Sequence, residues 1–126
     1  MTEISSPLIL VVDDEPLLAN LNKRLLVKVG YRVDVATESR LAMKMIADSP
    51  QKYDLLITDF AMSGASGAEL IDFALGVNSK LPIIIFTGAM EKATKDQMIQ
   101  LGVKKVIIKP VLGKELQKAA QAILEG

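Results

Sequence analysis

Three short runs of the sequence contain only apolar residues, and they constrain the fold more than any other feature. The runs span residues 8–12, 55–57 and 82–86, and the second lies within the stretch Tyr-Asp-Leu-Leu-Ile-Thr-Asp at residues 53–59. None of them alternates with polar residues, as a strand with one solvent-facing side would. Such runs are typical of strands buried on both faces, which occur in parallel sheets covered by helices on both sides.

Amphipathic segments separate these runs in the first half of the chain. A helix is predicted to begin at Pro16, because proline suits the first helical turn, and to end at Gly30, where glycine can cap it. Residues 31–36 alternate between apolar and polar, which indicates a more exposed strand at the sheet edge. Thr37 or Ser39 can cap a second helix. The predicted inner residues of these two helices are Leu17, Leu18, Leu21, Leu25 and Val29, and Leu41, Ala42, Met45 and Ile46.

The second half of the chain continues the same order. A third helix is predicted from about Ala68, and a fourth over residues 91–101 that closes at Gly102. A short last strand at residues 106–108 precedes the final helix. The predicted inner residues of the third and final helices are Leu70, Ile71 and Ala74, and Leu112, Leu116, Ala119, Ala120 and Ile123.

Five strand–helix units with short connections predict parallel strands joined by right-handed crossovers. The expected fold is therefore α/β: a flavodoxin-like, doubly wound, five-stranded parallel sheet of order 2-1-3-4-5 with five helices. With 126 residues the chain suits one domain, predicted over residues 8–124 after a flexible N-terminus at residues 1–7.

Polar side chains directly follow four of the predicted strands: Asp13 and Asp14, Asp59, Thr87 and Lys109. The carboxyl ends of parallel strands meet at one edge of the sheet, so these side chains are expected to converge. Two like charges about 4 Å apart repel by roughly 4 kcal/mol at an effective dielectric near 20, so three carboxylates there call for a cation. Mg²⁺ suits such a site, because it prefers a few carboxylates together with water and phosphate oxygens. These are the parts of a phosphoryl-transfer site in which a carboxylate is the acceptor.

The composition excludes several other chemistries. The chain has no cysteine and no histidine, which rules out disulfides, thiol nucleophiles, a Ser-His-Asp triad and an ordinary zinc site. Its formal net charge is zero, so no general attraction to nucleic acid or to an anionic membrane is expected. No apolar segment reaches membrane-spanning length and no signal-peptide pattern is present, so a cytoplasmic location is expected.

Over about residues 8–124 the chain resembles a response-regulator receiver domain of two-component signalling. The shared motifs each follow a predicted strand: Asp13-Asp14, Asp59-x-x-Met62 with Gly67, Thr87-Gly88 and Lys109-Pro110. Any one of these motifs is weak, but all of them in order are highly specific.

The resemblance implies that Asp59 accepts a phosphoryl group from a phosphohistidine on a histidine kinase or phosphotransfer protein. It also implies that Asp13, Asp14, Asp59 and the backbone carbonyl of Ala61 hold Mg²⁺, and that Thr87 and Lys109 bind phosphoryl oxygens. The expected result is a switch in affinity for a downstream protein partner, or a phosphorylation-dependent homodimer, without turnover of a separate substrate. In this family the Lys-Pro bond is commonly cis, so a cis bond is predicted between Lys109 and Pro110.

Four positions depart from the family pattern. Val106 stands where the family usually has the aromatic residue that takes part in switching. Ser63 replaces a frequent proline, which predicts a looser loop after Asp59. Ala61 and Ala89 occupy positions that tune phosphoryl lifetime, and neither side chain can orient or block water.

Other functions fit the same residues less well. A haloacid-dehalogenase-type phosphatase needs a second aspartate two residues after the nucleophile, where this chain has Ala61. A flavin-binding module would need a hydroxyl-rich loop after the first strand, which is missing. A degenerate receiver that acts only as an interaction module draws support from Val106 alone.

Two questions of context stay open at the level of sequence. From Ala89 onward the sequence has seven lysines and only four acidic residues. This excess indicates a solvated face or, alternatively, a docking surface on the fourth helix, fifth strand and fifth helix. The chain could be a stand-alone regulator. The segments Ile-Thr-Asp, Phe-Thr-Gly and Lys-Pro-Val also resemble receivers of hybrid histidine kinases, which slightly favours a kinase-linked or excised receiver.

Overall fold

A five-stranded parallel sheet forms the centre of the molecule, in a computed structural model that describes residues 6–62, 64, 66–111 and 113–126. The strand order is β2-β1-β3-β4-β5, and every neighbouring pair is parallel. This confirms the predicted flavodoxin-like topology. The strands are β1 (Leu8–Val12), β2 (Arg32–Ala36), β3 (Leu55–Thr58), β4 (Ile83–Thr87) and β5 (Lys105–Ile108).

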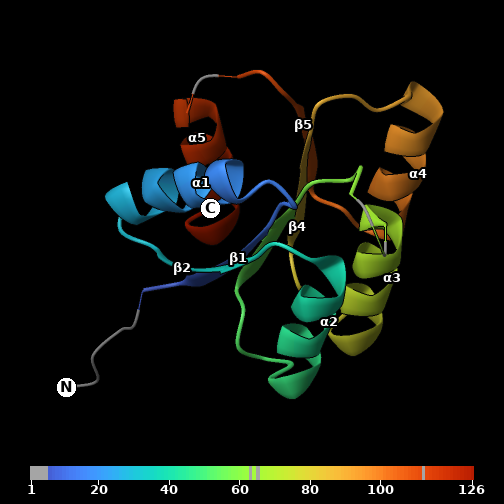
Figure 1. The fold of residues 1–126 in the computed structure, drawn as a ribbon, viewed down its shortest axis with the longest axis horizontal. Helices are drawn as coiled ribbons and strands as arrows, with labels where there is room; N and C mark the ends of the chain where they lie inside the picture. Colours follow the sequence, from blue (N-terminus) through green and yellow to red (C-terminus); the bar gives the residue numbers. More distant parts are fainter. Residues whose placement is uncertain (1–5, 63, 65, 112) are drawn as a thin grey trace.

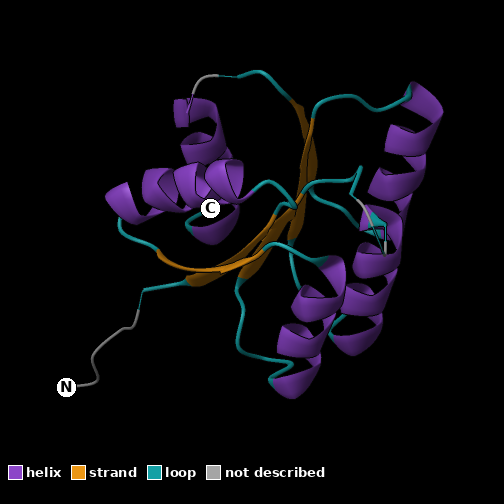
Figure 2. Ribbon diagram, viewed as in Figure 1, coloured by secondary structure: helices purple, strands orange, loops and turns teal. Residues whose placement is uncertain are grey.

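Five helices cover the two faces of this sheet (Figure 1). Helices α1 and α5 lie side by side on one face, and α2, α3 and α4 cover the other, as the secondary-structure colouring in Figure 2 also shows. The helices are α1 (Pro16–Lys28), α2 (Ser39–Asp48), α3 (Gly67–Val77), α4 (Lys92–Leu101) and α5 (Gly113–Leu124).

The central strand β1 supplies side chains to both layers of the core. Leu10 and Val12 pack among residues of α2, α3 and α4, whereas Ile9 and Val11 pack with residues of α1 and α5. All five residues of β1 are buried, as are all four of β3. The uninterrupted apolar runs of the sequence are therefore explained by burial on both faces.

The inward faces of α1 and α2 differ from the prediction. In α1 the buried residues are Ala19, Asn22 and Leu26, whereas Leu17 is 86% exposed and Leu21 is 49% exposed. The positions 19, 22 and 26 also follow helical spacing, so a leucine-rich helix offers two candidate stripes. Packing against β1 and α5 selects the stripe that contains the small Ala19.

Helix α2 shows the same effect on a smaller scale. Ala42 and Ile46 are buried as predicted, but Leu41 is 43% exposed. The predicted cap by Thr37 or Ser39 is wrong, because the capping position is Glu38 and no side chain caps the helix. Ser39 is instead the first residue of α2, and its buried hydroxyl lies 3.8 Å from the sulfur of Met62.

The remaining helices agree better with the sequence. Helix α3 begins at Gly67, one residue before the predicted start, and Ser66 caps it by accepting a hydrogen bond from the Glu69 N–H. Gly30 and Gly102 follow α1 and α4 with φ of +102° and +124°, which suits glycine at helix ends. The predicted inner residues of α3 are all buried, and so are Leu116, Ala119 and Ala120 of α5, with Ile123 half-buried.

Three predictions fall on residues outside the described part of the chain. The first is Leu112, predicted as an inner residue of the last helix, and the second is Ser63, from which a looser loop is predicted. The third concerns residues 1–5, which make up most of the predicted flexible N-terminus. Among the described residues, no helix has the length and hydropathy needed to cross a bilayer.

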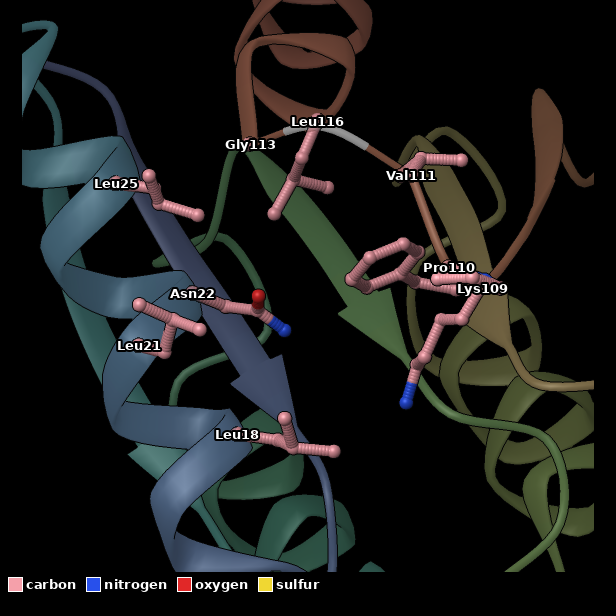
Figure 3. A pocket seen from close by; sticks show the side chains of 10 residues that line it. Leu18, Leu21, Asn22, Leu25, Lys109, Pro110, Val111, Gly113 and Leu116 are labelled. Carbon is pink, nitrogen blue, oxygen red and sulfur yellow. The ribbon is translucent and has the colours of Figure 1, made fainter.

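Helices α1 and α5 leave a cavity where they approach the end of β5. The Gln117 side chain of α5 donates a hydrogen bond to the Leu25 carbonyl of α1 at 2.7 Å, which joins the two helices. Beside this contact a cavity of about 220 Å³ lies between α1, the segment 109–111 and the start of α5 (Figure 3).

Candidate functional site

The ends of β1, β3, β4 and β5 bring the predicted site residues to one edge of the sheet. Backbone hydrogen bonds continue the ladders past the strands: Asp13 N–H donates to Ala36 O at 3.2 Å and Asp59 N–H to Val12 O at 3.0 Å. Lys109 N–H donates to Thr87 O at 2.7 Å. The backbone around these side chains is therefore fixed by the sheet itself. The bond between Lys109 and Pro110 is cis, as predicted.

Three carboxylates form the acidic part of the site. Oxygen atoms of Asp13, Asp14 and Asp59 all lie within 4.8 Å of one another. Asp13 is buried, and the other two are half-buried. Separate carboxylate oxygens at this spacing match the donor set that a hard divalent cation requires, and burial weakens the solvent screening that would otherwise relieve their repulsion. The cluster predicted from the strand ends is present.

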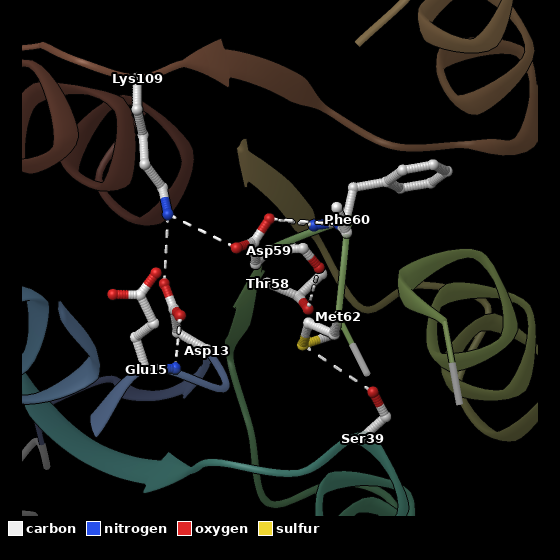
Figure 4. Close-up of polar contacts among 9 residues, drawn as sticks. Asp13, Glu15, Ser39, Thr58, Asp59, Phe60, Met62 and Lys109 are labelled. Atoms are coloured by element: carbon white, nitrogen blue, oxygen red, sulfur yellow. Dashed lines mark hydrogen bonds and ion pairs between the residues drawn. The ribbon is translucent and has the colours of Figure 1, made fainter. Parts of the chain in front are cut away.

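Lys109 provides the positive charge beside these carboxylates (Figure 4). Its ammonium lies 3.2 Å from Asp13 Oδ2, with which it is hydrogen-bonded, and 3.5 Å from Asp59 Oδ2. The side chain is only 19% exposed, and its Nζ lies 5.2 Å from the centroid of the Phe86 ring. A lysine held from two sides in this way is a fixed cation rather than a solvent-facing one.

The two oxygens of Asp59 have different surroundings. Oδ1 accepts hydrogen bonds from the backbone N–H of Phe60 at 2.6 Å and of Ala61 at 3.3 Å, whereas Oδ2 faces Lys109. The backbone donors fix the rotation of the carboxylate. They were not foreseen from sequence, because which N–H a carboxylate meets depends on the course of the loop. The Ala61 carbonyl, predicted as a metal ligand, stays a prediction.

Thr87 reaches the site as a buried hydroxyl. It is 1% exposed, and its Oγ1 has no hydrogen-bond partner within the described residues. A buried hydroxyl without a partner is costly, so an incoming oxygen at this position would be stabilised. Thr58 is equally buried at the end of β3, but its hydroxyl donates to the Asp59 carbonyl at 2.8 Å.

Gly67 supports the loop that follows Asp59. A side chain here would place its Cβ 2.6 Å from Phe60 Cα and 2.8 Å from Asp59 O, and the Gly67 N–H donates to Phe60 O at 3.0 Å. Only glycine allows the start of α3 to approach the backbone of Asp59 this closely. The sequence motif that pairs Gly67 with Asp59 thus has a steric basis.

Three of the four residues that depart from the family pattern, Val106, Ala61 and Ala89, are described by the structure. Val106 is half-buried and packs against the same apolar cluster as Phe60 and Met90. In Figure 4 the Phe60 ring points away from the carboxylates. Ala61 and Ala89 are both exposed, and Ser63 lies outside the described residues.

Comparisons with known proteins agree with this geometry. The sequence model of the response regulator receiver domain matches residues 9–121. A two-component response regulator of Oryza sativa subsp. indica, ORR23, is 28% identical over 116 residues, which is 92% of this chain and 17% of that protein. The sensor protein EvgS of Escherichia coli O157:H7 is 37% identical over 103 residues, which is 82% of this chain and 8% of that protein. The chain therefore spans less than a fifth of the length of each of these two relatives.

Solved structures show the same fold. A CheY-like receiver domain protein from Methanospirillum hungatei JF-1 has a TM-score of 0.90 at 24% identity, covering 96% of this chain and 95% of that one. The response regulator TrrA from Thermotoga maritima, solved with Mg²⁺ and BeF, has a TM-score of 0.81 at 30% identity, covering 94% of this chain and 99% of that one. The solved structures share the fold, and the family match over residues 9–121 shows that the chain belongs to the response regulator receiver domains of two-component signalling.

Proposed function

We propose that this receiver domain, over residues 8–124, accepts a phosphoryl group on Asp59 and thereby switches its affinity for a partner protein. The observation that carries the proposal is the placement of Lys109, whose ammonium contacts Asp59 at 3.5 Å and Asp13 at 3.2 Å beside three clustered carboxylates. A fixed cation next to a carboxylate held by backbone donors is suited to balancing the charge that a phosphoryl group brings.

The donor in this proposal is a phosphohistidine on a histidine kinase or phosphotransfer protein. An oxygen of Asp59 attacks phosphorus, the P–N bond breaks as the P–O bond forms, and the histidine nitrogen leaves with the electron pair. The chain contains no histidine, so the donor must belong to another protein or to another part of a longer one. The similarity to the sensor protein EvgS supports a kinase-linked donor.

Each residue of the rim has a role in the proposal. Asp13, Asp14, Asp59 and the Ala61 carbonyl would hold Mg²⁺, which when bound neutralises charge on the phosphoryl oxygens. Lys109 pairs with one phosphoryl oxygen. The unpartnered Thr87 hydroxyl donates a hydrogen bond to another oxygen, which satisfies a buried group that otherwise has no partner within the described residues.

The proposed output is a change in binding of a downstream protein, which includes a second copy of this chain. Phosphorylation changes the ion pairs of Lys109 and gives the Thr87 hydroxyl a partner, and both residues stand at strand ends next to the segments that lead to α4 and α5. The receiver turns over no separate substrate in this scheme.

The proposal is tested by phosphorylation with acetyl phosphate and Mg²⁺, followed by intact mass measurement. The native protein is expected to gain one phosphoryl group, and Asp59→Asn none. Asp72→Asn, at an exposed position of α3, is the matched control and is expected to behave like the native protein. Phosphorylation of Asp59→Asn would contradict the acceptor assignment. A native protein that gains no mass would favour a receiver that acts only as an interaction module.

A further inference from the structure

The cavity between α1 and the β5–α5 segment has almost entirely apolar walls. Leu18 and Leu25 of α1 face Leu116 of α5, and the backbone turn at Pro110 and Val111 closes one end. The volume of about 220 Å³ is sufficient for a single ring-sized group. The cavity opens to solvent next to Val111, which is 38% exposed.

One polar side chain, Asn22, interrupts the apolar walls. Asn22 is only 5% exposed, and no hydrogen bond reaches its side-chain amide within the described part of the chain. In Figure 3 the Asn22 amide extends from α1 toward the segment that carries Lys109 and Pro110. Its amide atoms are not among the fully enclosed, unpartnered side-chain atoms of the described residues, so a donor and an acceptor are accessible from the cavity.

Water satisfies this amide poorly. An ordered buried water needs two to four polar partners, whereas the walls offer Asn22 and, at the rim, an ammonium of Lys109 that already contacts Asp13 and Asp59. A molecule with an apolar body would replace weakly held water and gain the apolar contacts of the leucines.

The charges at the rim restrict what this molecule can be. Lys109 is the charged residue among those described as lining the cavity, and its ammonium is already paired with Asp13 and Asp59. A charged ligand would therefore enter the apolar cavity without a counter-ion. A neutral ligand does not meet this obstacle.

We propose that this cavity is a binding site for a small, neutral molecule with a ring-sized apolar body and a carboxamide or lactam group. The ligand amide pairs with the Asn22 amide, donating to its oxygen and accepting from its nitrogen, while the ring lies among Leu18, Leu25 and Leu116. The site borders the acceptor rim through Lys109, which contacts Asp59, but binding requires no phosphoryl group.

The site is tested with three small probes in ¹H–¹⁵N correlation spectra of the whole chain: benzamide, toluene and benzoate. Benzamide is expected to shift the signals of α1 and of residues 109–117 with a dissociation constant on the order of 1 mM. Toluene, which lacks the hydrogen bonds, is expected to bind about tenfold more weakly. Benzoate is expected to give no saturable shift in these segments.

Variants of α1 separate the amide contact from the apolar one. Asn22→Leu is expected to reverse the order, so that toluene binds better than benzamide, and Asn22→Ala serves the same purpose if the leucine is not accommodated. Asn20→Leu is the matched control, because Asn20 is exposed on the same helix. It is expected to leave both affinities unchanged.

Three results would overturn the assignment. The first is the absence of local shifts at about 10 mM benzamide, which is well above the dissociation constant expected for a ligand of this size. The second is equal benzamide affinity in the native protein and in Asn22→Ala. The third is saturable binding of an amphipathic leucine-rich peptide at this face, while none of the three probes binds. The last result would assign the cavity to a side chain of a protein partner instead.

Discussion

Thr58 and Thr87 end neighbouring strands, and their hydroxyls have opposite surroundings. Both residues are at most 1% exposed. Thr58 donates to the Asp59 carbonyl at 2.8 Å, whereas Thr87 Oγ1 has no partner among the described residues. The same residue type thus stabilises the fold at one strand end and lowers stability at the other, where the proposed phosphoryl oxygen would restore the missing bond.

Replacing each threonine by valine should therefore change stability in opposite directions. Thr87→Val is expected to raise the free energy of unfolding by about 1 kcal/mol, because it removes an unsatisfied hydroxyl without leaving a cavity. Thr58→Val is expected to lower it by about 1 kcal/mol, because a satisfied hydrogen bond is lost. Urea unfolding of the two variants and the native protein measures both changes. A loss of stability in Thr87→Val would show that its hydroxyl is satisfied in solution.

The sequence predicts the charged and hydroxyl side chains of the site but not the groups that hold them. Asp13, Asp59 and Lys109 are found at the predicted edge because strand ends of a parallel sheet converge, whatever the loops do. The contacts of the Phe60 N–H with Asp59 and of the Phe86 ring with Lys109 could not be predicted, because almost every residue has a backbone N–H and aromatic rings are common in strands. Asn22 lies at helical spacing from Ala19 and Leu26, the other buried residues of α1. The sequence alone does not distinguish this buried stripe from the stripe of leucines, because the choice between them depends on packing.

Among the elements, α3 depends most visibly on one residue. Its first residue, Gly67, lies against the backbone of Phe60, while Gly76 near its end has no atom within 4 Å of a Cβ position. The beginning of α3 therefore fixes the loop after Asp59, and its end is free of such contacts.

Substituting alanine at these two positions of α3 tests this difference. Gly67→Ala is expected to destabilise the protein by roughly 1–3 kcal/mol, because backbone atoms must move to accept the methyl group. Gly76→Ala is expected to stabilise it by about 0.5–1 kcal/mol, because alanine favours the helix. Chemical denaturation followed by circular dichroism reports both. Equal changes in the free energy of unfolding would mean that the loop after Asp59 can move to accommodate a side chain at position 67.

The end of α5 is tied to the beginning of β2 through Tyr31. The Tyr31 hydroxyl donates a hydrogen bond to the Glu125 carboxylate. Burial, followed by this hydrogen bond and the negative charge of Glu125, raises the pKa of Tyr31 to about 12. Burial and the hydrogen bond to Asp34 raise the pKa of Tyr53, the other tyrosine, as well.

These tyrosines predict a loss of stability at alkaline pH. An unfolded tyrosine ionises near pH 10, so the stabilising contribution of Tyr31 is complete below about pH 10 and is lost as the pH rises toward 12. In Tyr53→Phe, Tyr31 is the remaining tyrosine and alone contributes tyrosinate absorbance, which is expected to rise near pH 12. Glu125→Gln should lower that midpoint only in part, because burial is the larger cause. A midpoint near pH 10 in the folded protein would contradict the buried position of Tyr31.

Helix faces were the least predictable feature of the elements. The exposed Leu17, Leu21 and Leu41 are predicted to face inward because apolar residues recur there at helical spacing. Burial depends on which stripe meets the sheet, and a small residue such as Ala19 allows closer packing there. The strands were predicted well, because a run buried on both faces leaves no choice of side.

At the scale of the molecule, the proposed Mg²⁺ site predicts that stability depends on divalent cations. Mg²⁺ that binds the folded cluster alone is expected to stabilise the protein by about 2.7 kcal/mol at a concentration 100 times its dissociation constant. The melting temperature should therefore rise by several degrees and return when EDTA is added. Asp14→Asn is expected to diminish this shift, whereas Asp72→Asn should retain it. An equal shift in both variants would place the ion elsewhere.

The topology itself follows from sequence because five alternating strand and helix units leave few arrangements of a parallel sheet. The strand order β2-β1-β3-β4-β5 puts the two most apolar early runs, β1 and β3, at the centre, and the alternating segment β2 at one edge. The volume left between α1 and the β5–α5 segment could not be foreseen, because it depends on the fit of side chains from three separate elements.

The position of β5 at the other edge has a consequence for local unfolding. β5 pairs with β4 alone, so it can detach at the cost of one ladder of backbone hydrogen bonds. Detachment would also withdraw Lys109 from Asp13 and Asp59, and would leave the carboxylates to repel one another. An edge strand with a single neighbour is thus held partly by electrostatics, and the hydrogen exchange of its amides reports on carboxylates that follow other strands.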